Sequence, residues 1–181
     1  LIPEWKLIVD NLVDFPVDEF GYRMGKDKSG PYDHRHMSHL MMIYPLYLEN
    51  IDNAADINLL EKSVKNYEPT WAVKMGASHS SPVAAALGFG NLAYKRMNLI
   101  LYHNKESEAL GANGIYYLAT PCIETSLSYN NCVQDMFLQS WGNKIRVFPA
   151  LPDVWQDLSF HNLRTEGAFL VSAKREKGKT C

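Results

Sequence analysis

The chain has 181 residues, a length that fits one domain, or one domain with part of a second. Hydrophobic residues make up 46% of it and charged residues 21%, which excludes a disordered or fibrous protein. The formal charge of -2 argues against a nucleic-acid partner and favours a neutral or small one. The longest apolar stretch, residues 40–48, is interrupted by proline and is shorter than the roughly 20 residues of a membrane span.

The first third of the chain carries one helix signal, a loop signal and a second helix signal. A proline followed by apolar residues three or four apart predicts a helix over 3–13. Glycines, prolines and mixed charges predict a long loop over 15–33, a kind of segment that often carries function. Apolar residues then thicken over 36–48, which predicts a buried helix that Pro45 kinks or splits.

The middle of the chain shows the pattern of further helices. Asp56 is a suitable N-cap for a helix over 56–67, in which apolar residues again recur every three or four positions. Small residues after Pro82 predict a closely packed helix over 82–87, and another helix follows over 92–103. Because only a short turn joins these two helices, we expect them to form an antiparallel hairpin.

The pattern changes in the last third of the chain. Residues 104–130 have loop composition, and a helix is predicted over about 131–140. Polar and apolar residues then alternate over 144–148, as in a half-buried strand, and a second strand is predicted over 169–175. The sequence therefore predicts helical hairpins to about residue 141, followed by the beginning of a β region.

Three of the six histidines lie within six residues, at the end of the long predicted loop. These are His34, His36 and His39, with Arg35 between the first two. A metal site would need a third ligand at a recognisable spacing, and we find none. Two interpretations remain open: buried histidines bonded to the backbone, or imidazole and guanidinium groups that donate to the hydroxyls of a substrate.

Glu124 is the one carboxylate in a stretch that is otherwise neutral from Gly111 to Gln134. A general base must be ionised and within hydrogen-bond reach of a water, and hydroxyl and amide neighbours can arrange this. The alternative is that Glu124 is a surface acid or caps the helix that follows. Cys122 has no paired base at a known spacing, so the sequence does not favour a cysteine nucleophile.

Several segments, taken in order, resemble the glycoside hydrolase family 95 catalytic module, a family of α-L-fucosidases. Residues 34–40, HRHMSHL, with Tyr44 and Pro45, are similar to the family's HRHxSHLxxxYP. Residues 136–140 and 146–155 are similar to its MLLQS and LLPALPxxW segments, and residues 163–169 to its LRARGGF strand. Order and spacing agree over most of the chain.

The resemblance implies a fold and a division of the chain. The family's catalytic module is an (α/α)6 six-hairpin toroid, so we expect a mainly α structure followed by the first strands of a C-terminal β-sandwich. Residues 1–142 would be the C-terminal portion of the toroid, and residues 143–181 the start of the β domain. The resemblance also implies that the general acid lies N-terminal to this segment, so the segment alone is expected to be inactive.

The resemblance further implies an inverting hydrolysis of a terminal α-L-fucoside or a related sugar such as an α-L-galactoside. It assigns the base to Glu124, at the position of a family Asp, and the substrate side to His34, Arg35, His36 and His39. No metal or other cofactor is expected, the partner is an oligosaccharide or glycan, and a secreted or periplasmic location is suggested by the resemblance alone. The alternative is a carbohydrate-binding or structural module that has lost catalysis.

Overall fold

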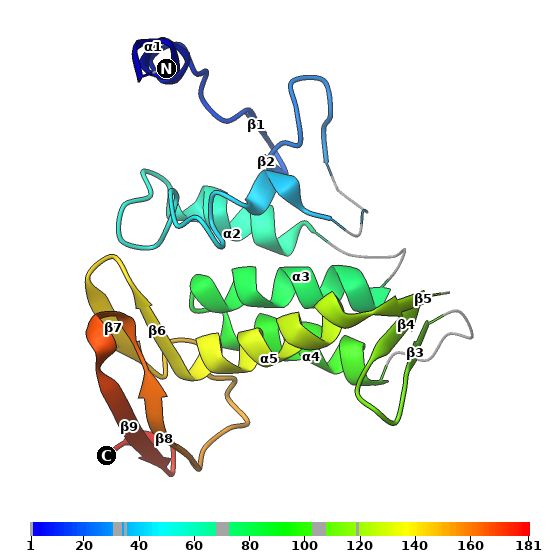
Figure 1. The fold of residues 1–181 in the computed structure, drawn as a ribbon, viewed down its shortest axis with the longest axis vertical. Helices are drawn as coiled ribbons and strands as arrows, with labels where there is room; N and C mark the ends of the chain where they lie inside the picture. The colour runs from blue at the N-terminus through cyan, green and yellow to red at the C-terminus, as the bar shows by residue number, and fades with distance from the viewer. Residues whose placement is uncertain (1, 31–33, 35, 68–72, 103–107, 119) are drawn as a thin grey trace.

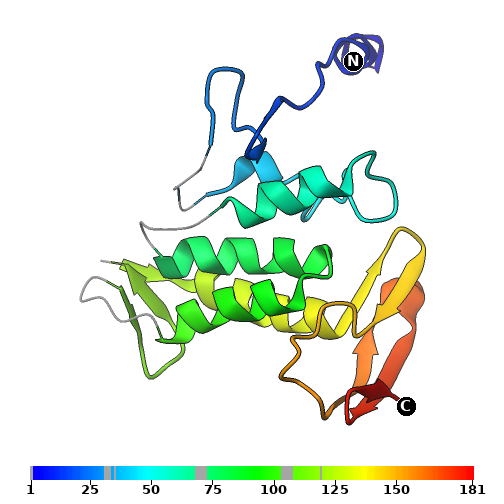
Figure 2. The same ribbon diagram turned by 180° about the vertical axis from the view of Figure 1, so that it is seen from behind.

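The computed structural model describes residues 2–30, 34, 36–67, 73–102, 108–118 and 120–181. Figure 1 shows a central layer formed by helices α3, α4 and α5, with small sheets at its two ends and the N-terminal segments above it. Seen from behind, α3 and α4 run side by side along this layer (Figure 2). None of the described helices is long and apolar enough to cross a membrane.

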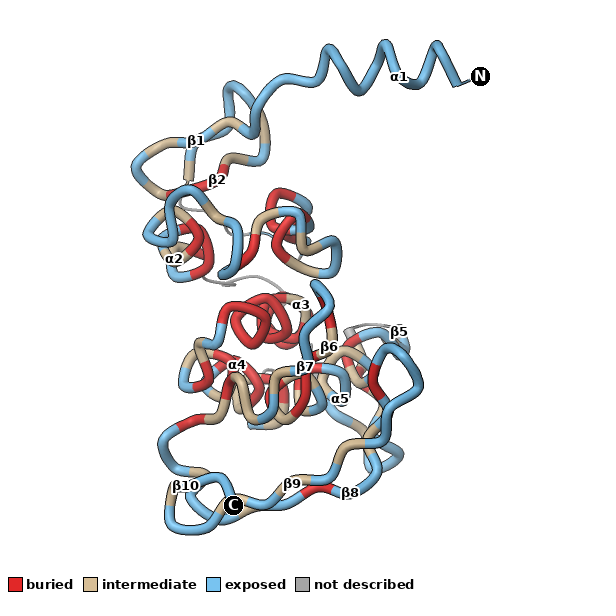
Figure 3. Tube along the Cα trace, turned by 90° about the vertical axis from the view of Figure 1, so that its left-hand side faces the viewer, coloured by how far each residue is buried: buried red, intermediate tan, exposed pale blue. Residues whose placement is uncertain are grey.

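The N-terminal helix is present but stands apart from the rest of the chain. Helix α1 spans Ile2–Asp10, which confirms the helix predicted at the start of the chain. It has no buried residue, and Figure 3 shows it projecting from the body in exposed colour throughout. The two-residue strands β1 (Val17–Asp18) and β2 (Gly21–Tyr22) pair antiparallel where the sequence predicted only a loop.

The segment that contains the histidines is less helical than predicted. Only a short 3-10 helix, η1 (Ser38–Leu40), forms, and turns follow it, so the helix predicted over 36–48 is wrong. Pro45 disfavours the α conformation of the residue before it, which limits helix growth here. Helix α2 (Ile57–Lys65) is confirmed, and the Asp56 carboxylate caps it by accepting from Asn58 N at 2.9 Å.

Helices α3 (Val73–Ala86) and α4 (Gly90–Tyr102) confirm the predicted antiparallel hairpin. However, α3 begins nine residues before Pro82, so this proline lies inside the helix and not near its start. A proline has no N–H, so the carbonyl of Ser78, four residues earlier, loses its helical donor. The Ser128 hydroxyl of α5 supplies a substitute by donating to Ser78 O at 2.9 Å.

The loop predicted over 104–130 is wrong. Strands β3 (Glu108–Leu110), β4 (Tyr116–Leu118) and β5 (Thr120–Cys122) form an antiparallel sheet there. Helix α5 (Ile123–Phe137) then begins eight residues earlier than predicted. Strands of three residues are too short to show the period-two alternation by which a strand is recognised.

The C-terminal part forms two more small sheets. Strands β6 (Leu138–Trp141) and β7 (Lys144–Val147) make a hairpin, and β7 confirms the first predicted strand. The second sheet has the order β10-β9-β8. Its members are β8 (Leu158–Arg164), β9 (Leu170–Glu176), which confirms the second predicted strand, and β10 (Lys179–Thr180). The predicted boundary between residues 142 and 143 falls in the turn of the β6–β7 hairpin, and the division remains a prediction.

The expectation of a mainly α toroid followed by a β-sandwich is wrong. Helices and short antiparallel strands are mixed along the chain, which gives a small mixed α/β domain. The physical reason is local pairing: the strands found here join neighbours that are close in sequence, so that sheets form between and beside the helices. The core joins the η1 segment with α2, α3, α4 and α5, through buried residues such as Leu40, Val64, Val83, Met97 and Met136.

Candidate functional site

The histidine segment divides into two exposed residues and one buried residue. His34 and His36 are exposed, and the His34 Nδ1 atom accepts from His36 N at 3.2 Å. Their ring centroids are 5.5 Å apart. The Tyr67 hydroxyl donates to His34 O, which fixes this backbone to the end of the α2 segment. Arg35, the fourth predicted substrate-side residue, lies outside the described residues.

His39 faces the core and not the solvent. It is 5% exposed, and its ring centroid lies 6.5 Å from that of Tyr67. Burial disfavours the charged imidazolium and lowers the pKa of His39 to about 4, so the ring is neutral near pH 7. His39 therefore contributes to packing beneath the segment.

A pocket of about 270 Å³ opens beside the histidine segment. His36 stacks on His79 of α3 at its wall, with ring centroids 5.6 Å apart and an interplanar angle of 22°. None of the described lining residues is Asp, Glu, Lys or Arg, so the pocket suits a neutral ligand. The lining residues are His36, Met37, Ser38, Met41, Tyr44, Pro45, His79, Pro82, Val83 and Ser128.

The pocket brings together segments that are far apart in sequence. Pro82 in α3 lines it, and the same proline frees the Ser78 carbonyl that binds the Ser128 hydroxyl. This contact holds α5 against α3 and brings Ser128 to the pocket wall. The pocket thus combines the η1 segment, α3 and α5. No pattern in the sequence linked His79 or Ser128 to the histidine segment.

Glu124 is not among the described lining residues of the pocket. It is an exposed residue in the first turn of α5, where the helix dipole favours an acid. Ser128 follows it by four residues, on the same face of the helix and about 6 Å further along the axis. The structure therefore brings His36 to the pocket, whereas Glu124 is not among the described lining residues.

A second carboxylate, which the sequence did not single out, lies behind the pocket wall. Asp135 of α5 lies beside the hydroxyl of Tyr44, a lining residue. Asn131 Nδ2 also donates to the Tyr44 oxygen, and it donates to Asp135 Oδ2 at 3.1 Å. Burial raises the pKa of Asp135 to about 6, and the neighbouring Tyr44 hydroxyl opposes this shift.

One sequence signal would have found this group. Glu124, Ser128, Asn131 and Asp135 are spaced four, three and four residues apart, which places polar side chains along one face of a helix. The signal was hidden because the helix was expected to begin near residue 131. Across the described residues, no three His, Cys, Asp or Glu side chains are grouped to hold a metal ion.

No protein-family model matches the chain, and no curated protein matches it. The resemblance to glycoside hydrolase family 95 therefore depends on the motif residues alone.

Proposed function

We propose that the chain forms part of a glycoside hydrolase that acts on a neutral terminal sugar, an α-L-fucoside or a related α-L-galactoside. The observation that carries the proposal is the pocket beside the HRHMSHL segment, whose described lining residues include no Asp, Glu, Lys or Arg and offer imidazole and hydroxyl groups among apolar side chains. Its volume of about 270 Å³ is close to the lower end of small-molecule sites, which suits a single sugar ring. Polar groups among apolar side chains match a ligand with hydroxyls on an apolar ring.

Glu124 is the proposed general base in an inverting reaction. The water oxygen bonds to the anomeric carbon on the face opposite the leaving group, and the water proton passes to the Glu124 carboxylate. The glycosidic C–O bond breaks, and the leaving oxygen takes a proton from a general acid, which the family resemblance puts N-terminal to this segment. His36 is proposed to bind substrate, with His34 and Arg35 beside it, whereas His39 supports the segment from the core.

A specific observation favours a second candidate, a carbohydrate-binding module without catalysis. Glu124 does not line the pocket and precedes Ser128, a lining residue on the same helix, by four residues. In addition, Thr125 and Ser126 follow Glu124 where the family has Gly and Asn. A site that binds the sugar but does not activate water would have these features.

Hydrolysis and binding, measured together, separate the candidates. The full-length polypeptide that carries this sequence is assayed with 4-nitrophenyl α-L-fucopyranoside and α-L-galactopyranoside, as wild type, Glu124→Gln and the control Glu19→Gln. Loss of a base lowers kcat by about a hundredfold or more, so Glu124→Gln is expected to lose at least this much while Glu19→Gln keeps wild-type rates.

Three outcomes contradict parts of the proposal. Equal rates for wild type and Glu124→Gln would remove Glu124 as the base. Binding of L-fucose without turnover of either glycoside would favour the binding module. If the wild type neither binds L-fucose nor hydrolyses either glycoside, a carbohydrate function for this pocket is refuted.

A further inference from the structure

We infer that a second pocket, beside the exposed ring of Phe169 in the C-terminal part of the chain, is a binding site for one neutral pyranose ring. This pocket has a volume of about 260 Å³ and shares none of the described lining residues of the histidine pocket. The residues that line it include Ser140, Asn143, Ile145, Glu166 and Phe169. The inference goes beyond the proposed function, because binding here does not require hydrolysis at the histidine pocket.

Two hairpins meet at this pocket. Strands β6 and β7 form one of them, and the 3-10 helix η2 (Glu166–Ala168) lies in the turn of the other, between β8 and β9; both hairpins lie at the same end of the molecule (Figure 1). Glu166 N donates to Ser140 Oγ at 2.8 Å, which joins this turn to β6. Ile145 is directly opposite Ser140 in the β6–β7 register, so both side chains lie on the face that meets η2.

The Phe169 ring gives the pocket an aromatic wall that solvent can reach. Phe169 is 61% exposed, and Ile145, which also lines the pocket, is 42% exposed. Gly167 has a φ of 76°, and a Cβ atom on it would lie 2.8 Å from Cε2 of Phe169, so the ring lies directly against the Gly167 backbone. Glycine permits both this φ and this close approach. A ring that is supported by backbone and still largely exposed can present an apolar face to a ligand.

The charged groups around the pocket balance one another. Lys144 lines the pocket, but in the hairpin it is directly opposite the buried Trp141, on the face that turns toward the core. Its Nζ atom pairs with Asp52 Oδ2 at 3.1 Å, and Arg146 pairs with the same carboxylate oxygen. Together with Glu166, these groups carry two positive and two negative charges, so their summed field does not favour a charged ligand.

The chemistry of the lining matches a pyranose. The Asn143 amide and the Ser140 hydroxyl can both donate and accept hydrogen bonds, whereas the Glu166 carboxylate accepts only. A pyranose has C–H bonds on the faces of its ring and hydroxyls around its rim, so an aromatic wall beside polar side chains is complementary to it. A wholly apolar ligand would instead cover Asn143 and Glu166 without giving them partners, which is costly. A few polar groups among apolar ones are typical of small-molecule sites.

The test measures binding of methyl β-D-galactopyranoside and methyl β-D-glucopyranoside to the full-length polypeptide by calorimetry. Each sugar has at least one ring face that carries only axial C–H bonds, and wild type is expected to bind one or both. Phe169→Ala should raise the Kd about tenfold, because the apolar wall is lost, whereas Phe169→Trp keeps an aromatic face and should stay within about threefold of wild type. Glu166→Gln replaces a charged acceptor by a neutral one and should raise the Kd about threefold.

Two control variants assign the binding to this pocket. Leu170→Ala removes an apolar side chain that is 59% exposed, directly follows Phe169 and is not among the described lining residues, so it should keep the wild-type Kd. His36→Ala changes the histidine pocket and should also keep it. Because Phe169 is exposed, Phe169→Ala should leave the urea midpoint of unfolding nearly unchanged, which separates lost binding from lost folding. Circular dichroism checks the fold of every variant.

Several outcomes would overturn the inference. These are no binding of either glycoside by wild type, an equal Kd in wild type and Phe169→Ala, and loss of binding in His36→Ala but not in Phe169→Ala. Tetramethylammonium is titrated as a further probe, and its binding in place of the glycosides would show a cation site and overturn the inference as well. Failure of the proposed function looks different: the polypeptide would bind one of these glycosides through Phe169 but would not hydrolyse 4-nitrophenyl α-L-fucopyranoside.

Discussion

Arg96 joins three segments of the core, and its replacement is expected to destabilise the protein strongly. The side chain is 4% exposed on α4. Its Nη1 atom donates to Ser80 O at 3.2 Å, and its Nη2 atom donates to Val64 O at 2.5 Å and Tyr67 O at 2.8 Å. Tyr67 in turn donates to His34 O, so Arg96 also supports the histidine segment indirectly.

The size of the effect follows from what Arg96→Met would leave behind. Each buried carbonyl that loses its donor costs about 1–3 kcal/mol, although such costs do not simply add. Met has no charge to desolvate, which offsets part of the lost unfolding free energy. Removal of one member of a buried charged network commonly costs about 3–5 kcal/mol. We expect a loss in this range. Arg96→Lys keeps a charge but puts all its donors on one nitrogen, so we expect roughly half the loss.

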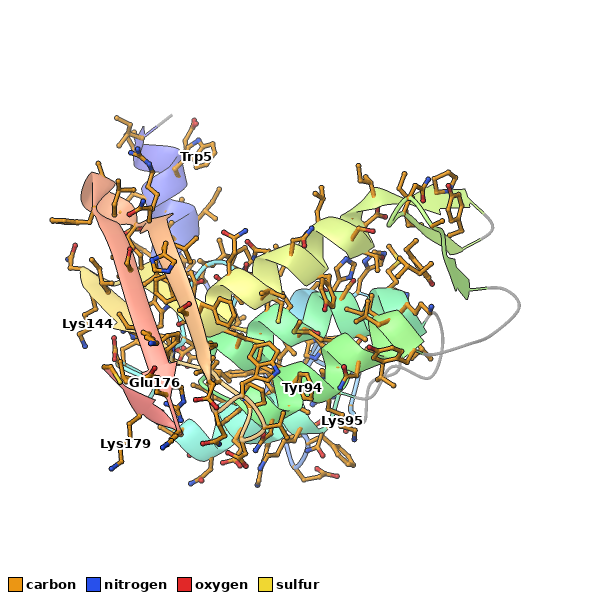
Figure 4. All side chains as sticks on the ribbon, turned by 90° about the horizontal axis from the view of Figure 1, so that it is seen from below. Trp5, Tyr94, Lys95, Lys144, Glu176 and Lys179 are labelled. Carbon is orange, nitrogen blue, oxygen red and sulfur yellow. The ribbon has the colours of Figure 1, made fainter. Side chains whose placement is uncertain are left out.

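Urea unfolding, followed by tryptophan fluorescence and far-UV circular dichroism, measures the free energies of unfolding. Lys95→Met is the matched control, because Lys95 is the exposed neighbour of Arg96 on α4 (Figure 4) and should change stability by no more than about 0.5 kcal/mol. Stability should fall in the order wild type, Arg96→Lys, Arg96→Met. A loss below about 1 kcal/mol in Arg96→Met, or an equal loss in Lys95→Met, would refute the reasoning.

Three further predictions concern other parts of the molecule. The folded-state pKa of Asp135 is raised from 3.8 to about 6, so the stability linked to its proton is fully present below about pH 3.8 and is lost as the pH rises through 6. Urea titrations should show that wild type, compared with Asp135→Asn, loses about 3 kcal/mol of unfolding free energy between pH 3.5 and 8. A difference between the two proteins that does not change with pH would contradict this. A Cβ atom on Gly90 would lie 2.3 Å from Leu151 O, so Gly90→Ala should lower the free energy of unfolding by about 1–3 kcal/mol, measured by urea unfolding. Gly25 has open space around it, so Gly25→Ala should change the free energy of unfolding little, and equal losses in the two variants would contradict the packing at Gly90. Trp5 is 66% exposed on α1, so Trp5→Glu should reduce the binding of a hydrophobic dye, and unchanged dye fluorescence would argue against α1 as the dye site.

The parts of the fold that the sequence predicted are those with local causes. Asp56 bonds a backbone N–H two residues away, so its role as a cap is visible in a short window. The antiparallel hairpin follows from a short turn between two helices. Pro82 was misplaced because the donor that compensates for it, the Ser128 hydroxyl, is 50 residues further along the chain. A compensation of this kind can be seen only once the fold is known.

The same distinction applies to the candidate site. The density of the histidine segment predicted His36 at a binding site, and the structure places it in a pocket. His79, which stacks on His36, belongs to α3 and is brought to His36 only by tertiary packing. His39 lies in the core because η1 is a single short turn, and its side chain follows the buried side of that turn. Asp135 was missed because the start of α5 was expected too late.

The two carboxylates on α5 cannot share the acid and base roles of one inverting reaction. Eleven residues separate Glu124 from Asp135, which at about 1.5 Å per residue puts them about 16 Å apart along the helix axis. Side chains on a helix lean toward its N-terminus, so both lean in the same direction and the separation is kept. An inverting pair lies about 6.5–9.5 Å apart. Hydrolysis with Glu124 as base would therefore require an acid other than Asp135.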